Sequence, residues 1–128
     1  MDIDLLKYIL PSELLSHFTI VGLSEYLDKS TNISSLYISL EEQNVLPSGY
    51  DHSHYESKGF YPEKQIQDFP IRGKSVYLLI RRRRWRNKDN PSEIIHNDYS
   101  FIAEGSKLTK ELSDFLKGTG RYPRRYNQ

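Results

Sequence analysis

The residues with the clearest chemical potential are five arginines grouped around one tryptophan in the segment VYLLIRRRRWRNKDNP, residues 76–91. Residues 71–88 contain eight basic residues and no acidic residue. Arginine has a planar set of donors that matches phosphate oxygens and the edge of guanine. The segment therefore indicates a surface for a polyanion such as nucleic acid, with a merely solvated charged face as the alternative. Its candidate contact residues are Arg72, Lys74, Arg81, Arg82, Arg83, Arg84, Trp85, Arg86 and Lys88.

The rest of the charge is distributed unevenly. Residues 1–56 carry two lysines against nine acids, whereas residues 57–128 carry sixteen basic residues against eight acids. A split of this kind is typical of a basic surface for a polyanion beside an acidic part that stays off it. The acidic half could also mask the basic half until a partner arrives.

The arginines must be positioned by a strand. If residues 75–86 form one strand, it is about 40 Å long, whereas a compact domain of this length is about 35 Å across. Val76, Leu78 and Ile80 then belong to the core, and the arginine end lies at the surface. Alternation puts arginines on both faces of the strand, and burying unpaired guanidinium groups is costly. The sequence therefore predicts a two-stranded ribbon that protrudes from the sheet and enters the major groove of duplex DNA.

Two details of this ribbon stay open. Trp85 either stacks on a base or sugar or packs beneath an arginine to brace the ribbon, and bracing is the more common role of a tryptophan. Asp89, Glu93 and Asp98 could neutralise some of the arginines across the hairpin, which would leave a surface of ordinary ion pairs.

The fold class predicted for the whole chain is α+β, as a single domain over residues 1–118 with a flexible basic tail at 119–128. Helical spacing of apolar residues predicts an N-terminal helix that Pro11 ends or resets, and an amphipathic C-terminal helix over residues 106–117. Alternation predicts an antiparallel pair of strands within 17–23 and 34–42. A three-stranded antiparallel meander is expected from residues 65–71, 75–86 and 93–102, while residues 47–58 resemble a loop.

Several classes of function are disfavoured. The chain has no cysteine, which excludes disulfides, thiolate metal sites and a cysteine nucleophile. Asp51, His52, His54 and Glu56 could assemble a metal site, but a solvated loop is the favoured interpretation, and no metal or cofactor is expected. Neither a nucleophile motif nor a glycine-rich phosphate loop is present, so independent catalysis is not expected. With no signal peptide and no apolar run of about 20 residues, a cytoplasmic protein without a membrane partner is predicted.

The strings GFYPEKQIQDFPIRGKSVYLLIRRRRW and IAEGSKLTKELSDFLK resemble the N-terminal region of transposases from bacterial insertion sequences. The resemblance covers most of residues 13–118 and is strongest over 57–86. More distantly, the chain is similar to the transposase group in which a small zinc-binding β-domain and a helix-turn-helix precede a DDE nuclease. The resemblance implies binding to the double-stranded terminal repeats of the element, in partnership with a catalytic transposase domain or subunit.

The sequence departs from that group because the zinc-binding cysteines and the DDE acids are missing. The resemblance therefore implies a non-catalytic module without zinc. The DNA contacts that it implies are Arg81, Arg82, Arg83, Arg84 and Trp85, with Arg72 and Lys74 at the preceding turn. The helix at 106–117 is a second candidate as the first helix of a helix-turn-helix, although a structural role is favoured for it.

Two other functions remain open on the sequence. In the first, the chain is a protein-interaction module, in which the acidic half docks a partner or the basic ribbon of a second copy as a homodimer. In the second, the chain binds RNA, with some of its ten tyrosines stacking on unpaired bases. No aromatic pair at strand spacing supports the RNA interpretation.

Overall fold

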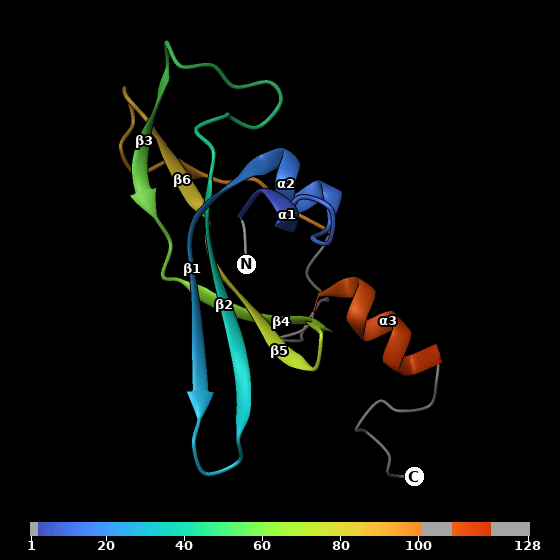
Figure 1. The fold of residues 1–128 in the computed structure, drawn as a ribbon. Helices are drawn as coiled ribbons and strands as arrows, with labels where there is room; N and C mark the ends of the chain where they lie inside the picture. The colour runs from blue at the N-terminus through green and yellow to red at the C-terminus, as the bar shows by residue number, and fades with distance from the viewer. Residues whose placement is uncertain (1–2, 101–108, 119–128) are drawn as a thin grey trace, which may run out of the picture.

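The computed structural model describes residues 3–100 and 109–118 and has a mixed α+β architecture, which confirms the predicted fold class (Figure 1). The elements in order are α1 (Ile3–Leu6), α2 (Ser12–His17), β1 (Phe18–Asp28), β2 (Ile33–Glu42), β3 (Tyr55–Phe60), β4 (Lys64–Ile71), β5 (Lys74–Arg81), β6 (Arg83–Asn87), β7 (Ile94–Ile95) and α3 (Lys110–Gly118). The strands form two sheets, and the chain passes between them after β2, β3 and β5.

The larger sheet has four strands in the order β1-β2-β5-β4. It consists of two antiparallel hairpins, β1–β2 and β4–β5, joined by parallel pairing of β2 with β5. The tight turn predicted between β4 and β5 is confirmed. Arg72 and Gly73 occupy it with φ of 53° and 79°, the positive values that a two-residue hairpin turn of type I′ requires at both positions.

The hydrophobic core lies between this sheet and the N-terminal helices. Alternate residues of β2, β4 and β5 point to one face, where Leu6, Leu10 and Leu14 cover them. Helices α1 and α2 lie against the same side of β1 and β2 (Figure 1). The helical segment predicted before Pro11 is shorter than expected, since only Ile3–Leu6 is helical and residues 7–10 form a turn. Pro11 immediately precedes α2, as the sequence predicts.

The smaller sheet has three strands in the order β3-β6-β7. The single strand expected over residues 75–86 is divided at Arg82, whose carbonyl accepts a hydrogen bond from the Tyr61 N–H at 2.8 Å. The predicted two-stranded ribbon is therefore a three-stranded sheet, because β3 pairs with the second edge of β6. Residues 55–58, expected to be loop, belong to β3. Of the strand expected at 93–102, the structure describes residues 93–100, and within these only Ile94–Ile95 is a strand.

The C-terminal helix is confirmed over Lys110–Gly118. Thr109 caps it, because its hydroxyl accepts a hydrogen bond from the Leu112 N–H at 3.3 Å. The same hydroxyl donates to the buried carboxylate of Asp68 at 2.9 Å, which attaches the helix to β4. Residues 101–108, which include part of the predicted helix, and the predicted tail at 119–128 lie outside the described residues. No helix among the described residues combines the length and the apolar character needed to cross a membrane.

Candidate nucleic-acid interface

The arginine run is divided by the break at Arg82 into a half that is held by other side chains and a half that is presented outward. In β5 the even-numbered residues Val76, Leu78 and Ile80 are fully buried. In β6 the buried residue is the odd-numbered Trp85. The side of the chain that faces the interior therefore changes between the two strands. Arg82 lies where this change occurs.

The arginines next to the break are engaged by neighbouring residues. Arg81 Nη1 forms an ion pair with Glu41 Oε2 at 2.7 Å. Arg82 Nη2 donates to the Asn97 carbonyl at 2.7 Å and lies 3.6 Å from Asp98 Oδ1. The residues predicted as acidic partners in this region were Asp89, Glu93 and Asp98. Of these three acids, only Asp98 pairs with an arginine in the part of the chain that the structure describes.

Arg83 is held at both ends of its guanidinium group. Its Nε donates to the Glu42 carbonyl at 3.2 Å, and its Nη1 donates to Ser57 Oγ at 2.8 Å. The guanidinium carbons of Arg81 and Arg83 lie 4.5 and 4.6 Å from the centroid of the Phe60 ring. Arginine over an aromatic face gains a cation–π attraction in addition to its hydrogen bonds. These contacts fix two of the predicted contact residues at the joint between the sheets.

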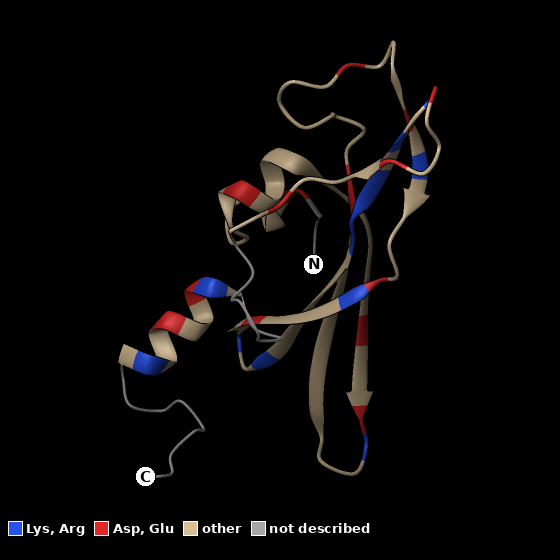
Figure 2. Ribbon diagram, turned by 180° about the vertical axis from the view of Figure 1, so that it is seen from behind, with Lys and Arg blue, Asp and Glu red and all other residues tan. Residues whose placement is uncertain are grey.

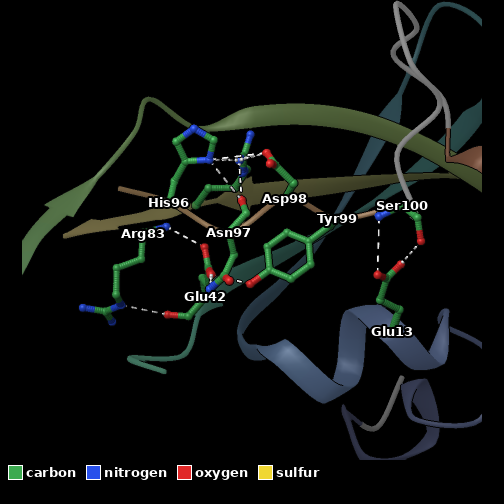
Figure 3. A network of polar contacts seen from close by, with 9 residues as sticks. Glu13, Glu42, Arg83, His96, Asn97, Asp98, Tyr99 and Ser100 are labelled. Atoms are coloured by element: carbon green, nitrogen blue, oxygen red, sulfur yellow. Dashed lines mark hydrogen bonds and ion pairs between the residues drawn. The ribbon is translucent and has the colours of Figure 1, made fainter. Parts of the chain in front are cut away.

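Glu42 is the centre of a buried polar network at this joint (Figure 3). Its Oε1 accepts the Arg83 backbone N–H at 2.8 Å. Its Oε2 accepts a hydrogen bond from Asn97 Nδ2 at 3.1 Å and another from the Tyr99 hydroxyl. Burial and the hydrogen bond to Glu42 raise the pKa of Tyr99 well above its usual range. Three donors thus compensate a buried carboxylate, which would otherwise destabilise the fold.

Trp85 has no exposed surface, and its Nε1 donates to Asn44 Oδ1 at 2.7 Å. In β6 it pairs with Ser57 of β3 on one side and Ile95 of β7 on the other. The implied role of Trp85 as a DNA contact is wrong for this conformation, because no face of the indole is accessible to a base. The bracing interpretation agrees with the geometry.

The outward face of the smaller sheet carries a group of cations, which we call the basic face and define as Lys58, Arg84, Arg86 and Lys88. Alternation places the three residues of the β6 segment on one side, opposite Trp85. Arg84 Nε donates to the Lys58 carbonyl at 3.4 Å, and Lys88 Nζ donates to the His52 carbonyl at 3.0 Å. In Figure 2 the basic segments of β6 lie beside β3, the strand that carries Lys58.

One carboxylate lies among these cations. Arg86 Nε and Glu56 Oε2 are 2.7 Å apart. The pKa of Glu56 is lowered, first by the hydrogen bond from Arg86 and also by the charges of Arg86, Lys88 and Lys58, while partial desolvation opposes the shift. Four cations with one carboxylate leave this face with a net positive charge. In the described part of the chain, Arg84 and Lys88 donate to carbonyl oxygens and form no ion pair, and the Arg84 guanidinium carbon also lies 5.8 Å from the centroid of the Tyr61 ring.

Arg72 and Lys74 lie away from the basic face. They occupy the turn at the start of β5, whereas Arg81 ends that strand about 25 Å away along an extended chain. Lys74 Nζ pairs with Glu25 Oε2 at 2.7 Å, and Arg72 is exposed. The structure therefore does not bring the turn residues together with the β6 cations into one surface.

Sequence reasoning missed Lys58 and the glutamates that hold the arginines. Lys58 was assigned to a loop because YESKGF lacks clear alternation. One signal in the sequence could have identified the glutamates. Glu41 and Glu42 end one apolar strand segment, and Arg81 and Arg82 end another, so the two ends carry opposite charges. Parallel pairing sets Glu41 directly opposite Arg81.

The histidine-containing loop forms a local hydrogen-bonded turn. Asp51 Oδ1 accepts hydrogen bonds from Ser53 Oγ at 2.5 Å and from the His54 backbone N–H at 3.2 Å. Hydrogen bonds from Ser53 and then His54 lower the pKa of Asp51 to about 2. In residues 3–100 and 109–118, no three acidic or histidine side chains gather in a way that could hold a metal ion.

The chain matches no protein-family model, no curated protein and no solved structure.

Proposed function

We propose that this chain is a non-catalytic DNA-binding module of an insertion-sequence transposase. It would hold the double-stranded terminal repeats of the element for a DDE catalytic domain that is not in this sequence. The observation that carries the proposal is the basic face, where Lys58, Arg84, Arg86 and Lys88 surround the single carboxylate of Glu56. The resemblance of residues 57–86 to transposase N-terminal regions supports the same class of ligand.

The arrangement of these cations suits the phosphate backbone. Arg84 and Arg86 stand on one side of a strand that is paired on both edges, so no backbone ordering is needed to present them to a ligand. Arginine can meet a phosphate with two parallel hydrogen bonds. If all four cations met phosphates, log K would fall with log salt at a slope of about −3.6. Affinity would then drop by about 150-fold between 50 and 200 mM salt.

This proposal revises the set of contacts expected from the sequence. Arg84, Arg86 and Lys88 stay in it, and Lys58 is added. Arg81 and Arg83 leave the set for duplex DNA because they lie at the joint between the sheets, where Arg81 stacks over Phe60 of β3 and Arg83 donates to the Glu42 carbonyl of β2. Arg82 leaves it because it donates to the Asn97 carbonyl. We further propose that the chain is cytoplasmic and that it acts together with a catalytic transposase subunit.

Self-association of the acidic half with the basic half of another copy is less favoured. Glu41, Glu42 and Glu56, which belong to the acidic half, contact Arg81, Arg83 and Arg86 of the same chain. The charge complementarity noted in the sequence is thus at least partly satisfied within one molecule. A homodimer built on these contacts would require them to open.

The test is fluorescence anisotropy of labelled duplex carrying the terminal repeat, against a scrambled duplex, at 50 and 200 mM salt. We expect Arg84→Gln with Arg86→Gln to weaken binding at least tenfold and to reduce the salt slope by about two. The matched control is Arg72→Gln with Lys74→Gln, which removes two cations at the distant turn. Equal losses in both double variants, or no salt-sensitive binding by the unchanged chain, would contradict the proposal.

A further inference from the structure

The face of the larger sheet opposite the core carries no charged side chain at six consecutive outward positions of its two central strands, up to the Glu41–Arg81 pair at their end. The outward residues of β2 and β5 pair in register as Ser35 with Ser75, Tyr37 with Tyr77 and Ser39 with Leu79. All six are partly exposed and none is buried. Charged residues make up 27% of the chain, and a solvated sheet face is where they usually collect. A flat face of hydroxyls and aromatic rings is unusual at such a position and indicates a ligand.

Two tyrosines stand at the centre of this face. The rings of Tyr37 and Tyr77 are stacked, with centroids 5.3 Å apart and planes inclined by 19°. Their neighbours across the sheet are Ser24 on β1 and Gln67 on β4. Serines occupy three of the four neighbouring outward positions along β2 and β5. Both tyrosines are partly exposed, and the serines beside them along the strands are short, so a planar group can reach the exposed part of the ring pair.

The same face ends in cations. Arg81, paired with Glu41, lies four residues beyond Tyr77 on the same side of β5, about 13 Å along the strand. Beyond it, the guanidinium group of Arg83 shares the Phe60 ring with that of Arg81. Stacking rings in the middle of a sheet and arginines at its end are the combination that binds unpaired bases and their phosphates. In a duplex the base faces are already stacked on one another, so duplex DNA cannot use the tyrosine pair.

We propose that this face binds single-stranded nucleic acid, with bases stacked on Tyr37 and Tyr77 and the backbone directed toward Arg81 and Arg83. The proposal extends the nucleic-acid function proposed above but depends on a different face of the molecule. The sequence suggests stacking by tyrosines in general but does not single out this pair, because Tyr37 and Tyr77 are forty positions apart and become neighbours only through the parallel pairing of β2 with β5. DNA and RNA offer the same bases and phosphates to this surface.

Binding is tested by anisotropy with labelled single strands of twelve deoxyuridines and of twelve uridines, which differ only in the 2′-hydroxyl. We expect Tyr37→Ser with Tyr77→Ser to weaken binding about tenfold or more. Tyr37→Phe with Tyr77→Phe keeps the stacking surface and should keep the affinity. The matched control is Tyr8→Ser, since Tyr8 is 86% exposed and lies outside the sheet. Preference for one oligonucleotide identifies the sugar, whereas no binding to either overturns the proposal.

A second measurement needs no variant and covers the case in which the double serine variant does not fold. Stacked bases shift the ring-proton resonances of both tyrosines upfield when deoxyuridine oligonucleotide is added to the unchanged protein. Shifts confined to Arg84 and Arg86 would overturn the tyrosine site. So would a dimer, measured by sedimentation, that the two serine substitutions dissociate, because the face would then be covered by a second copy.

The two proposals fail separately. Loss of duplex binding in the Arg84→Gln, Arg86→Gln variant with single-strand binding retained assigns the two ligands to two faces. Duplex binding without any single-strand binding retains the basic face and removes the tyrosine site. Single-strand binding without duplex binding removes the proposed end-binding function and retains the tyrosine site.

Discussion

The two halves of residues 76–88 have similar alternation but opposite orientations. In β5 the even-numbered side chains enter the core, and in β6 the odd-numbered Trp85 does so while Arg84 and Arg86 point outward. The consequence for arginine is large. Beside the break the arginines are fixed at the joint between the sheets, whereas Arg84 and Arg86 stand on the outward side of β6, where only Arg86 has a carboxylate partner among the described residues. A run of identical residues therefore does not form one functional unit when the surface that it meets changes along the run.

The largest effect is expected where the buried side of β6 is removed. Trp85→Ala deletes a fully buried indole and its hydrogen bond to Asn44. We expect the free energy of unfolding to fall by about 3–5 kcal/mol, as measured by urea denaturation. The comparison variant is Arg84→Ala, one residue away on the outward side, which should change stability by less than about 1 kcal/mol. Similar losses in the two variants would contradict the assignment of opposite sides.

The second effect separates two adjacent glutamates. Glu42→Gln leaves one oxygen to serve three donors and turns an amide toward Asn97 and Tyr99. We expect a loss of about 2–3 kcal/mol, because at least one buried donor stays unpaired. Glu41→Gln is the matched control on the neighbouring, partly exposed residue, and it should cost less than about 1 kcal/mol. If the order of the two were reversed, the network around Glu42 would not be what holds the sheets together.

A third and smaller effect concerns pH. The pKa of the Glu56 carboxyl is below its ordinary value of 4.5 because Arg86 donates a hydrogen bond to the ionised form. A lowered pKa in the folded state means that Glu56 contributes stability above pH 4.5. This contribution is lost as the pH falls through the folded-state value. Carbonyl NMR should show a titration midpoint below 4.5 that moves upward in Arg86→Gln, and an unchanged midpoint would exclude the ion pair as its cause.

The smallest effect is expected at the exposed turn. Lys74→Gln breaks the ion pair with Glu25, whose pKa is lowered chiefly by the hydrogen bond from Lys74. Both side chains are substantially exposed, so thermal denaturation should show a loss below about 1 kcal/mol. A loss comparable to that of Glu42→Gln would mean that surface pairs, and not the buried joint, dominate the electrostatic stability.

The sequence predicts the local parts of this fold well. The antiparallel pair within residues 17–23 and 34–42, the turn before Lys74 and the helical spacing around Leu112 depend on neighbours along the chain, and each prediction was confirmed. A register shift between Ile20 and Gly22 nevertheless interrupts the alternation expected in the first of these strands. The break at Arg82 was missed because its cause is not local. The Glu42 carboxylate accepts the Arg83 N–H from forty-one positions away, and no periodicity in the arginine run indicates this contact.

The candidate site was predicted only in part for the same reason. Residue type identified Arg84, Arg86 and Lys88, but exposure and ion pairing decide which cations a ligand can reach. The acids that neutralise the run come from β2 and β3 as well as from the neighbouring Asp98. Lys58 was missed because β3 contains Gly59 with φ of 89°, a conformation that interrupts regular alternation.

The parallel ladder between β2 and β5 also determines how the chain can fold. Each of the two hairpins closes through a short turn, and hairpins of this kind form in about 1–10 μs. Docking of the two hairpins requires β2 to pair with β5, which places Leu36 next to Val76. Pairing between segments so far apart in the sequence is slow. We expect Val76→Ala to slow refolding in stopped-flow experiments more than a substitution at the β1–β2 turn. The tyrosine pair would then be assembled only in this last, rate-limiting step.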